Sequence, residues 1–513
     1  MDEASRNRLS VAGLFLSLLL SIVAIYWKTV FYPFIYDDWG ILRTIIYGDK
    51  LEYLAHAFSP VGKILYRPLG SMYFLLTYIF FKLDPRGFHL ISLIIHFLNS
   101  LLVVRIVKEL SKDAFIGWVV GFLYAVAVTV HIEPLLWLAG FYDVGGALFY
   151  FLSIYLFLGR KYSLSAFVYC LGILTKETVV ALPVLLLMSI LITEGNSRPR
   201  FGSLKSVLSK LGLHAIFLIA YALIKLIGVS PLTVAGNDSF RIAFTGPHIA
   251  NNLLKYATWA ISTVLAGDDV WKNERVLFII CLGLIVALAA AWILMYRRGE
   301  RDFRIRLTTR TFFWTAWSIL GVIPVVFLEH HADKYFLIYS LVPFFALLLL
   351  GLRLTLLHLH LKNSVVQTLI ILIVVSNLYS SSGYLAGQSQ KPNFISGTYS
   401  LIQKAEVVDK VKSFLEKEYP FLPHGSALVF YRLETASFLN ENGPQVWYND
   451  TTLRVYQTNQ IRRDSVGISI LARRDDHSEK IYVDTTKTFV FLLYYGEVRR
   501  YDLSLQRSGD PDE

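Results

Sequence analysis

Long apolar stretches separated by short polar segments make up most of the chain before about residue 382. Segments such as 11–27, 114–130, 276–296 and 364–378 run for roughly 15–21 residues with almost no charge, near the length a helix needs to cross about 30 Å of hydrocarbon. The pattern therefore predicts spanning helices. We place eleven, at 10–31, 87–107, 114–131, 143–159, 162–175, 178–193, 207–229, 275–296, 311–328, 335–354 and 364–382.

Two further apolar stretches are less suited to spanning. The stretch from Leu69 to Leu83 is short, rich in Tyr and preceded by Arg67-Pro68, and the connection 248–266 has a similar character. We interpret both as helices that lie along the membrane surface. Either could instead be a span, which would change the side on which every later segment lies.

The pattern changes after about residue 396, where it becomes that of a soluble domain. We expect a charged amphipathic helix near 399–418 and then strands, at 426–431, 453–457, 466–471, 480–483 and 487–494. The predicted fold is therefore an all-α polytopic membrane domain over 1–382, whose outer loop 32–86 carries an acidic motif, followed by a small α/β soluble domain over 383–513.

Composition agrees with a membrane protein. The 513 residues are 55% hydrophobic and only 17% charged, which is too apolar for one soluble core. The net charge of +11 does not indicate nucleic-acid binding, because Lys and Arg lie in short segments between the apolar stretches. If those segments are cytoplasmic, so is the N-terminus, and the C-terminal domain is extracytoplasmic. The membrane would be a bacterial or archaeal cytoplasmic membrane or the endoplasmic reticulum.

The most prominent polar motif is Tyr36-Asp37-Asp38-Trp39, directly after the first span. A carboxylate at this interface can act as a general base. Adjacent like charges near low dielectric raise one pKa, which suits removal of a proton from a hydroxyl. Asp37 and Asp38 are therefore the candidate catalytic residues. The alternative is a solvated loop in which both charges only mark the end of the span.

Other ionisable residues fall at the same predicted outer ends. His131 and Glu133 close the third span and Asp143 opens the fourth, and a shared polar pocket would explain such residues at membrane depth. Lys176-Glu177 interrupts the apolar stretch between the fifth and sixth spans, where Lys176 could meet an anionic phosphate. The competing interpretations are an ordinary polar loop and a Lys176–Glu177 salt bridge.

A dense charged segment lies between two later spans and contains Glu329, His330, His331, Asp333 and Lys334. Adjacent His residues rarely point at one ion, so we favour charge recognition over a metal site. Cys170 and Cys281 both lie in apolar runs, which supports neither a disulfide nor a Cys-based metal site. No cofactor is predicted. A divalent metal stays conceivable without support from the pattern.

Arg67, in Tyr66-Arg67-Pro68-Leu69, and His89, at the start of the second span, complete the predicted set of outer substrate-binding residues. For each residue alone, snorkelling or anchoring at the membrane surface is the simpler interpretation.

In an ordered set of motifs the chain resembles the type C (GT-C) polytopic membrane glycosyltransferases: Tyr36-Asp37-Asp38, Tyr66-Arg67-Pro68-Leu69, Pro85-x-Gly87-Phe88-His89-Leu90 with His96, Thr175-Lys176-Glu177-Thr178, and Glu329 to Tyr335. The likeness is greatest to the protein O-mannosyltransferase branch whose relatives carry tetratricopeptide repeats, and it covers roughly residues 10–380. Two features depart from that branch. The C-terminal α/β region replaces the repeats, and Phe141-Tyr142-Asp143 stands where the branch tends to have Gly-Arg-Asp, which leaves donor contacts open.

The resemblance implies an active site on the lumenal or periplasmic side and a polyprenyl-phosphate-linked hexose, such as mannose, as donor. It also implies that Asp37 or Asp38 is the base. The base would deprotonate an acceptor hydroxyl, which attacks the anomeric carbon while the lipid phosphate leaves. The residues expected to meet that phosphate are Lys176, Arg67, His330, His331 and Lys334. The acceptor, a hydroxyl on protein, lipid or glycan, does not follow from the resemblance.

Two other classes of protein stay open. A transporter or flippase of lipid-linked substrates is also a multi-span protein with ionisable residues, but it should place them near the midplane and show two similar halves. Here the charges gather at one predicted face, and no repeated half is visible. An inactive membrane scaffold would tolerate the loss of Asp37 and Asp38.

Overall fold

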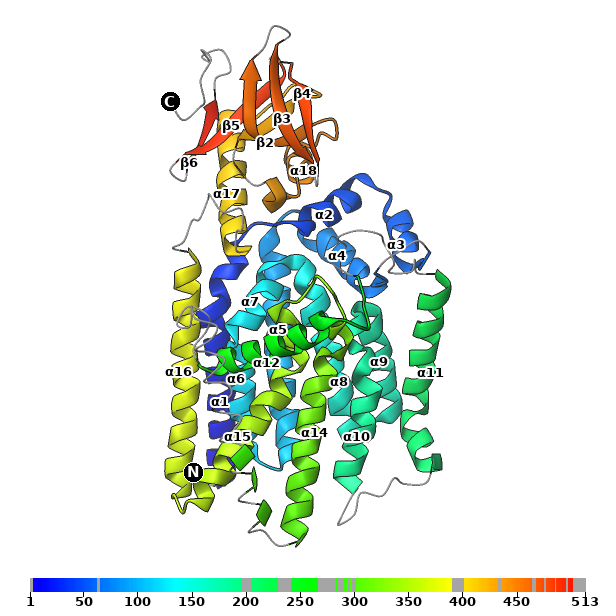
Figure 1. The fold of residues 1–513 in the computed structure, drawn as a ribbon, viewed down its shortest axis with the longest axis vertical. Coiled ribbons are helices and arrows are strands. Elements are labelled where there is room, and N and C mark those ends of the chain that lie inside the picture. Colours follow the sequence, from blue (N-terminus) through cyan, green and yellow to red (C-terminus); the bar gives the residue numbers. More distant parts are fainter. Residues whose placement is uncertain are drawn as a thin grey trace.

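The computed structural model describes residues 3–61, 65–194, 204–228, 241–265, 301–389, 401–431, 433, 435–463, 467–474, 477–484, 486–494 and 497–501, with a few positions between 283 and 297. A bundle of long helices forms most of the molecule, and a six-stranded sheet stands at one end of it (Figure 1). The first helix begins at the opposite end of the bundle (Figure 1). The predicted combination of a polytopic helical protein with a small C-terminal α/β domain is confirmed.

Among the described residues, seven helical segments are long and apolar enough to cross a membrane. They comprise α1 (Glu3–Tyr26) with η1 (Trp27–Phe31), α5 (Pro85–Ser111), η2 (Leu138–Gly140) with α8 (Phe141–Leu158), α11 (Leu204–Gly228), α14 (Arg301–Val326), α15 (Leu341–His358) and α16 (Asn363–Ser389). An eighth candidate is a bent pair, α6 (Ala114–Val126) and α7 (Val128–Leu136). These segments coincide with predicted spans, whereas the span predicted at 275–296 lies largely outside the described residues.

Shorter helices complete the bundle and its sheet-facing end. The predicted spans 162–175 and 178–193 are shorter apolar helices joined by a short connection, namely α9 (Tyr162–Thr175) and η3 (Glu177–Ala181) with α10 (Leu182–Glu194). Three helices lie at the sheet-facing end of the bundle (Figure 1), namely α2 (Asp37–Tyr47), α3 (Lys50–Phe58) and α4 (Pro68–Phe81). At 1.5 Å per residue, the 14-residue α4 is too short to span. The other helix predicted at the surface is α12 (Pro247–Leu265), which packs on α7, α14 and α16.

The bend between α6 and α7 is 53°, and it occurs at Ala127. Such a break frees backbone carbonyls, which must find partners inside a membrane protein. Here neighbouring helices supply them. Nε2 of His96 lies 2.9 Å from the carbonyl oxygen of Ala125, and the Ser381 hydroxyl donates to the carbonyl of Val126 at 2.7 Å. The break is thereby tolerated.

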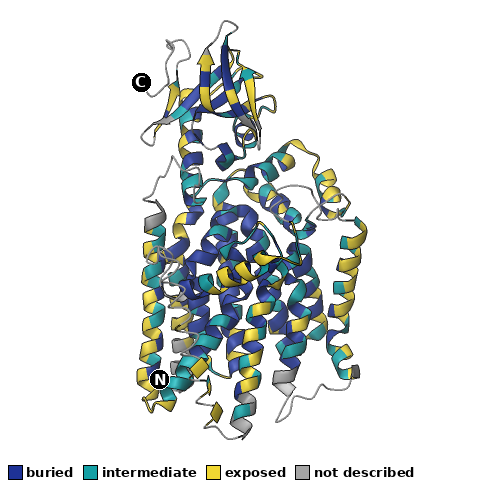
Figure 2. Cartoon of the chain, in the orientation of Figure 1, coloured by how far each residue is buried: buried dark blue, intermediate teal, exposed yellow. Residues whose placement is uncertain are grey.

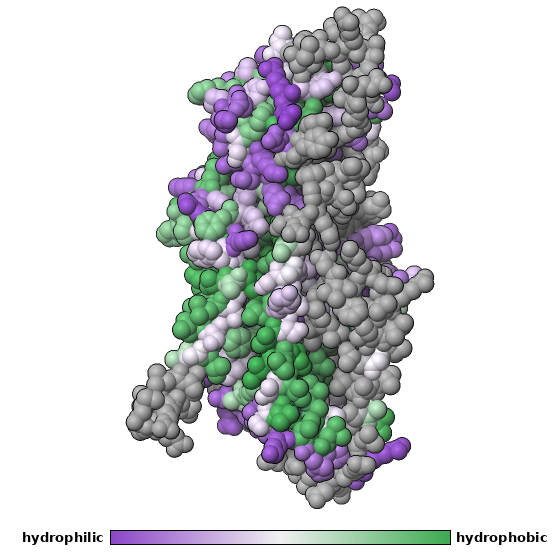
Figure 3. Space-filling view, turned by 90° about the vertical axis from the view of Figure 1, so that its left-hand side faces the viewer, coloured by the Kyte–Doolittle hydropathy of each residue, from purple (hydrophilic) through white to green (hydrophobic). Residues whose placement is uncertain are grey.

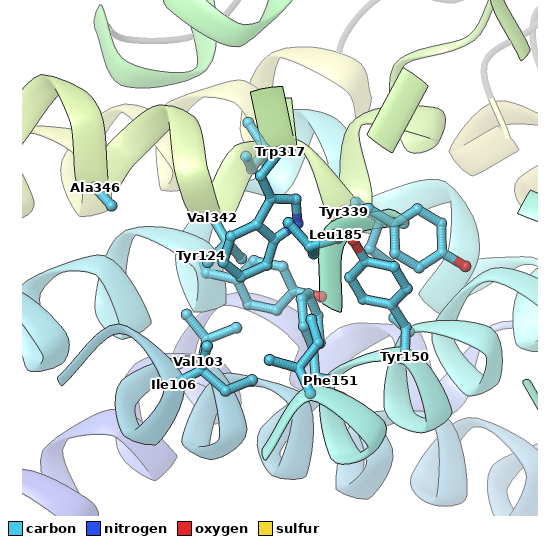
Figure 4. Packing of buried hydrophobic residues seen from close by; sticks show 14 of the residues in the cluster. Val103, Ile106, Tyr124, Tyr150, Phe151, Leu185, Trp317, Tyr339, Val342 and Ala346 are labelled. Atoms are coloured by element: carbon cyan, nitrogen blue, oxygen red, sulfur yellow. The ribbon is translucent and has the colours of Figure 1, made fainter. Parts of the chain in front are cut away.

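Large aromatic side chains fill the interior of the bundle (Figure 4). Trp317 and Tyr124 are fully buried, and the rings of Tyr150 and Tyr339 lie 4.7 Å apart. Buried positions face the centre of the bundle, while α11 and α16 expose long outer faces (Figure 2). Hydrophobic side chains are displayed along the bundle, and polar ones gather toward the sheet and at the far end (Figure 3). This distribution is that of an integral membrane protein.

The C-terminal domain begins with α17 (Leu401–Glu418), which packs against one face of the sheet. The strand order is β4-β3-β2-β1-β5-β6, with β1 parallel to β2 and β5 and the other pairs antiparallel. The strands are β1 (Ala427–Tyr431), β2 (Arg454–Arg463), β3 (Ile468–Arg474), β4 (His477–Tyr482), β5 (Thr488–Tyr494) and β6 (Glu497–Tyr501).

The first five strands lie at the predicted strand runs, whereas β6 and α18 (Asn442–Tyr448) were not predicted. The short segment η5 (Thr435–Phe438) precedes α18. Buried residues of the domain such as Phe438 and Val446 belong to the same apolar cluster as Trp39 of α2. The domain is therefore packed onto the helices beneath it.

Candidate active site

A cavity of about 290 Å³ lies where the sheet-facing ends of several bundle helices meet. Its walls come from the start of α2, the segment before α4, the α7–α8 and α9–η3 connections, α11, the end of α14 and η4 (Lys334–Tyr339). The acidic and basic side chains among its described lining are Asp37, Arg67, Asp143, Lys176, Glu177, Lys225 and His331. All except Lys225 are sequence candidates, so the fold brings together residues that lie far apart along the chain.

Asp37 is the first residue of α2, and it lines the cavity. Its carboxylate is partly buried and has no hydrogen-bond or salt-bridge partner within the described part of the chain. Burial raises the pKa of Asp37, and the charge of Lys404 partly opposes this rise. A carboxylate of this kind is free to accept a proton from a molecule in the cavity.

Asp38 has a different environment from its neighbour. Its side chain is buried and accepts three backbone hydrogen bonds, from Ile35 at 3.1 Å, Leu138 at 3.3 Å and Ala139 at 2.9 Å. Burial raises the pKa of Asp38 to about 7, even though the three N–H donors lower it. These bonds tie the loop before α2 to the α7–α8 connection. Asp38 does not line the cavity, so its position is that of a structural carboxylate.

Two ion pairs form a charged wall of the cavity. Nε and Nη2 of Arg67 donate to the Glu177 carboxylate at 2.8 and 2.5 Å, and the Lys176 ammonium donates to Asp143 at 2.5 Å. Both members of the Lys176–Asp143 pair are buried. The salt bridge considered between the sequence neighbours Lys176 and Glu177 is therefore not the arrangement found. Each cation instead pairs with a carboxylate from a distant segment.

Aromatic rings lie against both cations in the cavity wall. The Arg67 guanidinium lies 5.0 Å from the centre of the Tyr142 ring. The Lys176 ammonium lies 5.3 Å and 5.2 Å from the rings of Tyr335 and Phe336. Such contacts favour a cation when water is excluded. They place both cations in the cavity wall in defined orientations.

The residues of the charged segment before η4 lie in different environments in the structure. His331 lines the cavity, and its Nε2 lies 2.8 Å from the Tyr335 hydroxyl. Burial lowers the pKa of His331, and the Asp333 carboxylate, 3.1 Å from Nε2, opposes this change. Glu329 forms an ion pair with Arg241 at 3.2 Å, and His330 is exposed. Neither Glu329 nor His330 lines the cavity.

Glu133 and Lys334 form a second charged group beside the cavity but not in its lining. They interact electrostatically across the packed elements α7 and η4. Burial lowers the pKa of Lys334, and Glu133 opposes this change. Lys404 of α17 also interacts with Glu133. Lys404 of the C-terminal domain thus interacts with Glu133, which the sequence analysis placed only at the end of a span.

His89 and His131 are also outside the cavity lining. Both are fully buried. The ring nitrogens of His89 lie 3.1 Å and 3.2 Å from the carbonyl oxygens of Leu135 and Tyr32, so this residue links α5 to α7 and to the end of η1. The ring of His131 packs against His96, with centroids 4.4 Å apart. The structure therefore gives each a packing environment rather than access to the cavity.

In the part of the chain that the structure describes, no group of three or more His, Cys, Asp or Glu side chains could hold a metal ion. Cys170 is a half-buried free cysteine of α9, and Cys281 falls outside the described residues. The described lining of the cavity includes carboxylates, cations, the His331 ring and aromatic rings.

Several lining residues were not predicted, including Tyr36, Trp137, Tyr142, Lys225 and Phe336. Lys225 could have been found, since a lone ionisable residue near the end of an apolar span is a functional candidate by default. The aromatic residues carry no such signal, because aromatic side chains occur throughout the helices and mostly fill the core.

The fold and the cavity define an integral membrane protein with a charged pocket at the end of its helix bundle that faces an α/β domain. No protein-family model matches the chain. Over 149 residues, or 28% of the chain, it is 30% identical to protein O-mannosyl-transferase tmtc2 of Xenopus laevis. Over 145 residues it is 29% and 28% identical to the TMTC2 proteins of Mus musculus and Homo sapiens. The resemblance to the O-mannosyltransferase branch is confirmed over that segment.

The matched segment amounts to only 16–17% of the length of these relatives. Among solved structures, the chain is similar to the oligosaccharyltransferase of Archaeoglobus fulgidus in complex with Zn and sulfate, with a TM-score of 0.42 and 13% identity over 87% of this chain and 68% of that one. It is also similar to ArnT from Cupriavidus metallidurans bound to undecaprenyl phosphate, with a TM-score of 0.45 and 11% identity over 88% of this chain and 86% of that one.

Proposed function

We propose that this protein transfers a sugar, a hexose such as mannose, from a polyprenyl-phosphate carrier to an acceptor hydroxyl. One observation carries the proposal. The same cavity holds Asp37, whose carboxylate has no hydrogen-bond or salt-bridge partner among the described residues, and two oriented cations, Arg67 and Lys176. A base and a site for a leaving anion are what a one-step glycosyl transfer requires. The similarity to protein O-mannosyl-transferases supports the choice of a sugar.

In this mechanism Asp37 removes the proton of the acceptor hydroxyl. The oxygen forms a bond to the anomeric carbon as the bond from that carbon to the phosphate oxygen breaks, and the electron pair leaves with the lipid phosphate. The anomeric configuration is therefore inverted. The raised pKa of Asp37 makes it a stronger base than an exposed aspartate, which favours proton transfer.

Arg67 and Lys176 can meet the leaving phosphate although both are already paired. A guanidinium has five N–H donors, and Glu177 takes one on Nε and one on Nη2 of Arg67. An ammonium has three, and Asp143 takes one from Lys176. The donors that remain are held in fixed directions by the two carboxylates. Preorganised donors of this kind stabilise developing charge without reorganisation.

The position of the cavity supports an extracytoplasmic reaction. The cavity lies at the sheet-facing end of the bundle, and the N-terminal helix begins at the other end. The ends of α5 and α8 that point away from the cavity carry Lys108, Lys112, Arg160 and Lys161. Basic connections favour the cytoplasm, so the cavity would face outward. A transporter would need its ionisable site near the bilayer midplane instead.

The test measures sugar transfer from radiolabelled polyprenyl-phosphate sugars in membranes that contain the wild-type protein, Asp37→Asn or Asp38→Asn. A panel of lipid-linked hexoses and a mixture of membrane and peptide acceptors cover the open substrate identity. We expect transfer by the wild type and its loss in Asp37→Asn. Full activity of Asp37→Asn would contradict the base assignment, and no transfer from any carrier would contradict the proposed function.

A further inference from the structure

The C-terminal domain is bonded directly to the segment that carries Asp37. The backbone N–H of Tyr36 donates to the carbonyl of Ser437 at 2.8 Å. Tyr36 has a backbone φ of 51°. A residue other than glycine adopts this conformation only when its surroundings hold it there. The residue just before Asp37 is therefore held in an unusual conformation by a contact from another domain.

Further contacts fasten α2 to α18 of the same domain. The rings of Trp39 and Trp447 meet edge to face with centroids 5.5 Å apart. Nε of Arg43 donates to the Gln445 side chain at 2.5 Å, and the Tyr47 hydroxyl donates to the Gln445 carbonyl at 2.8 Å. These contacts repeat along one side of α2. The helix that begins with Asp37 is thus docked along its length.

Lys404 reaches the same segment from α17. Its ammonium lies 4.6 Å from the centre of the Tyr36 ring, and Tyr36 lines the cavity beside Asp37. Within the described residues, the ionisable groups that interact electrostatically with Asp37 lie on three elements: Asp38 on its own helix, Tyr142 on α8 and Lys404 on α17. Among these three, Lys404 is the only positive charge.

We propose that Lys404 is a positioning residue for Asp37, and that the C-terminal domain thereby completes the active site. Its cation holds the Tyr36 ring and favours the ionised form of the neighbouring carboxylate, which is the form that accepts a proton. The role in catalysis rests on the proposed function, because it takes Asp37 as the base. The electrostatic role in the folded protein does not.

The first experiment measures the ionisation of Asp37 without any substrate. Carbodiimides react with protonated carboxyl groups, so labelling of Asp37 across a pH series, read by fragment mass spectrometry, reports its titration. The full-length protein in detergent is compared with Lys404→Met, with Lys404→Gln as a second neutral variant and with Lys404→Arg. Lys417→Met is the matched control, since Lys417 is an exposed lysine of the same helix.

In the neutral variants we expect the midpoint of labelling to move to higher pH, so that labelling where wild-type Asp37 is mostly ionised rises several-fold. Lys404→Arg should restore the wild-type midpoint, and Lys417→Met should leave it unchanged. A wild-type midpoint in both Lys404→Met and Lys404→Gln would overturn the proposal. So would an equal shift in Lys417→Met, because any loss of charge on α17 would then suffice.

The second experiment follows sugar transfer by the same proteins across pH. We expect the acidic limb of the rate profile to move to higher pH in Lys404→Met. In Lys404→Arg the limb should return to its wild-type pH. An unchanged limb beside a shifted labelling midpoint would overturn the catalytic part of the proposal. If labelling shifts but the wild type transfers no sugar, the proposed function fails while the positioning of Asp37 by Lys404 stands.

Discussion

The Lys176 ammonium donates to the Asp143 carboxylate across 2.5 Å, and it does not pair with Glu177, its neighbour in sequence. Glu177 is instead held by Arg67, which precedes α4. This crossed pairing ties the α9–η3 connection to α8 and to the loop before α4. It keeps two cations in the cavity wall without leaving an uncompensated charge in a buried place.

Breaking one member of the Lys176–Asp143 pair should cost far more stability than removing both. Lys176→Met or Asp143→Leu leaves one buried charge alone, and we expect each to lower the free energy of unfolding by about 3–5 kcal/mol. The double variant should be less destabilised than either single variant, because no charge is then left alone. Denaturant unfolding in detergent measures all three proteins. Additive losses would show that the pair is not coupled.

Asp37→Asn should abolish most activity with little effect on folding. Loss of a general base lowers a rate by about 10²–10⁴-fold, and the Asp37 side chain makes no hydrogen bond or salt bridge within the described residues whose loss would destabilise the protein. We expect the unfolding midpoint to stay near that of the wild type while sugar transfer falls by about a hundredfold or more. A large drop in the midpoint would assign Asp37 a structural role instead.

Asp38→Asn should show the reverse pattern. One oxygen of Asp38 accepts from Ile35 and Leu138 and the other from Ala139, so the NH₂ of an asparagine would face at least one N–H donor. An unsatisfied buried donor costs about 1–3 kcal/mol. The unfolding free energy, measured side by side with that of Asp37→Asn, should fall by that amount. Equal stability of the two variants would count against a structural Asp38.

The pKa of Asp38 predicts how stability depends on pH. Burial raises this pKa from 3.8 to about 7, so between these values the folded protein binds more protons than the unfolded chain. The contribution of Asp38 to stability is therefore present at low pH and is lost as pH rises through about 7. The difference in unfolding free energy between wild type and Asp38→Asn should decrease from acidic to neutral pH. A difference that increases would contradict the direction of the shift.

Gly70 at the start of α4 should tolerate no side chain. A Cβ atom there would lie 2.0 Å from the Tyr142 ring, which covers Arg67. We expect Gly70→Ala to cost about 1–3 kcal/mol of stability and to lower transfer by displacing Tyr142 from Arg67. Gly212→Ala is the matched control, because nothing lies within 4 Å of a Cβ at that helical glycine. Wild-type stability and transfer in Gly70→Ala would refute this account.

Much of the membrane fold could be predicted because it depends on local properties. Apolar length alone marks segments such as α5 and α16 as spans, since a helix in hydrocarbon satisfies its own backbone hydrogen bonds. Alternation of apolar residues likewise located β1 to β5. The strand β6 was missed because its sequence, Glu-Val-Arg-Arg-Tyr, is mostly charged and exposed, and only pairing with β5 makes it a strand.

The candidate site was predicted only in part. The motifs singled out Asp37, Arg67 and Lys176, because charged residues at the ends of apolar spans need a reason to be there. They singled out His89 and His330 by the same argument, yet one is buried against backbone carbonyls and the other is exposed. Position along a span indicates depth in the membrane, but it does not indicate which way a side chain points.

By itself, the sequence determined that this chain crosses a membrane several times, carries its acidic motif after the first span and ends in a small α/β domain. Tertiary structure alone decided which carboxylate lines the cavity, which ion pairs form around the cavity and that Lys404 of α17 lies against the Tyr36 ring beside Asp37. The physical reason is distance. Burial into hydrocarbon is a property of each segment. Pairing and proton affinity depend instead on groups from different segments, such as Arg67 and Glu177, that meet only after the chain has packed together.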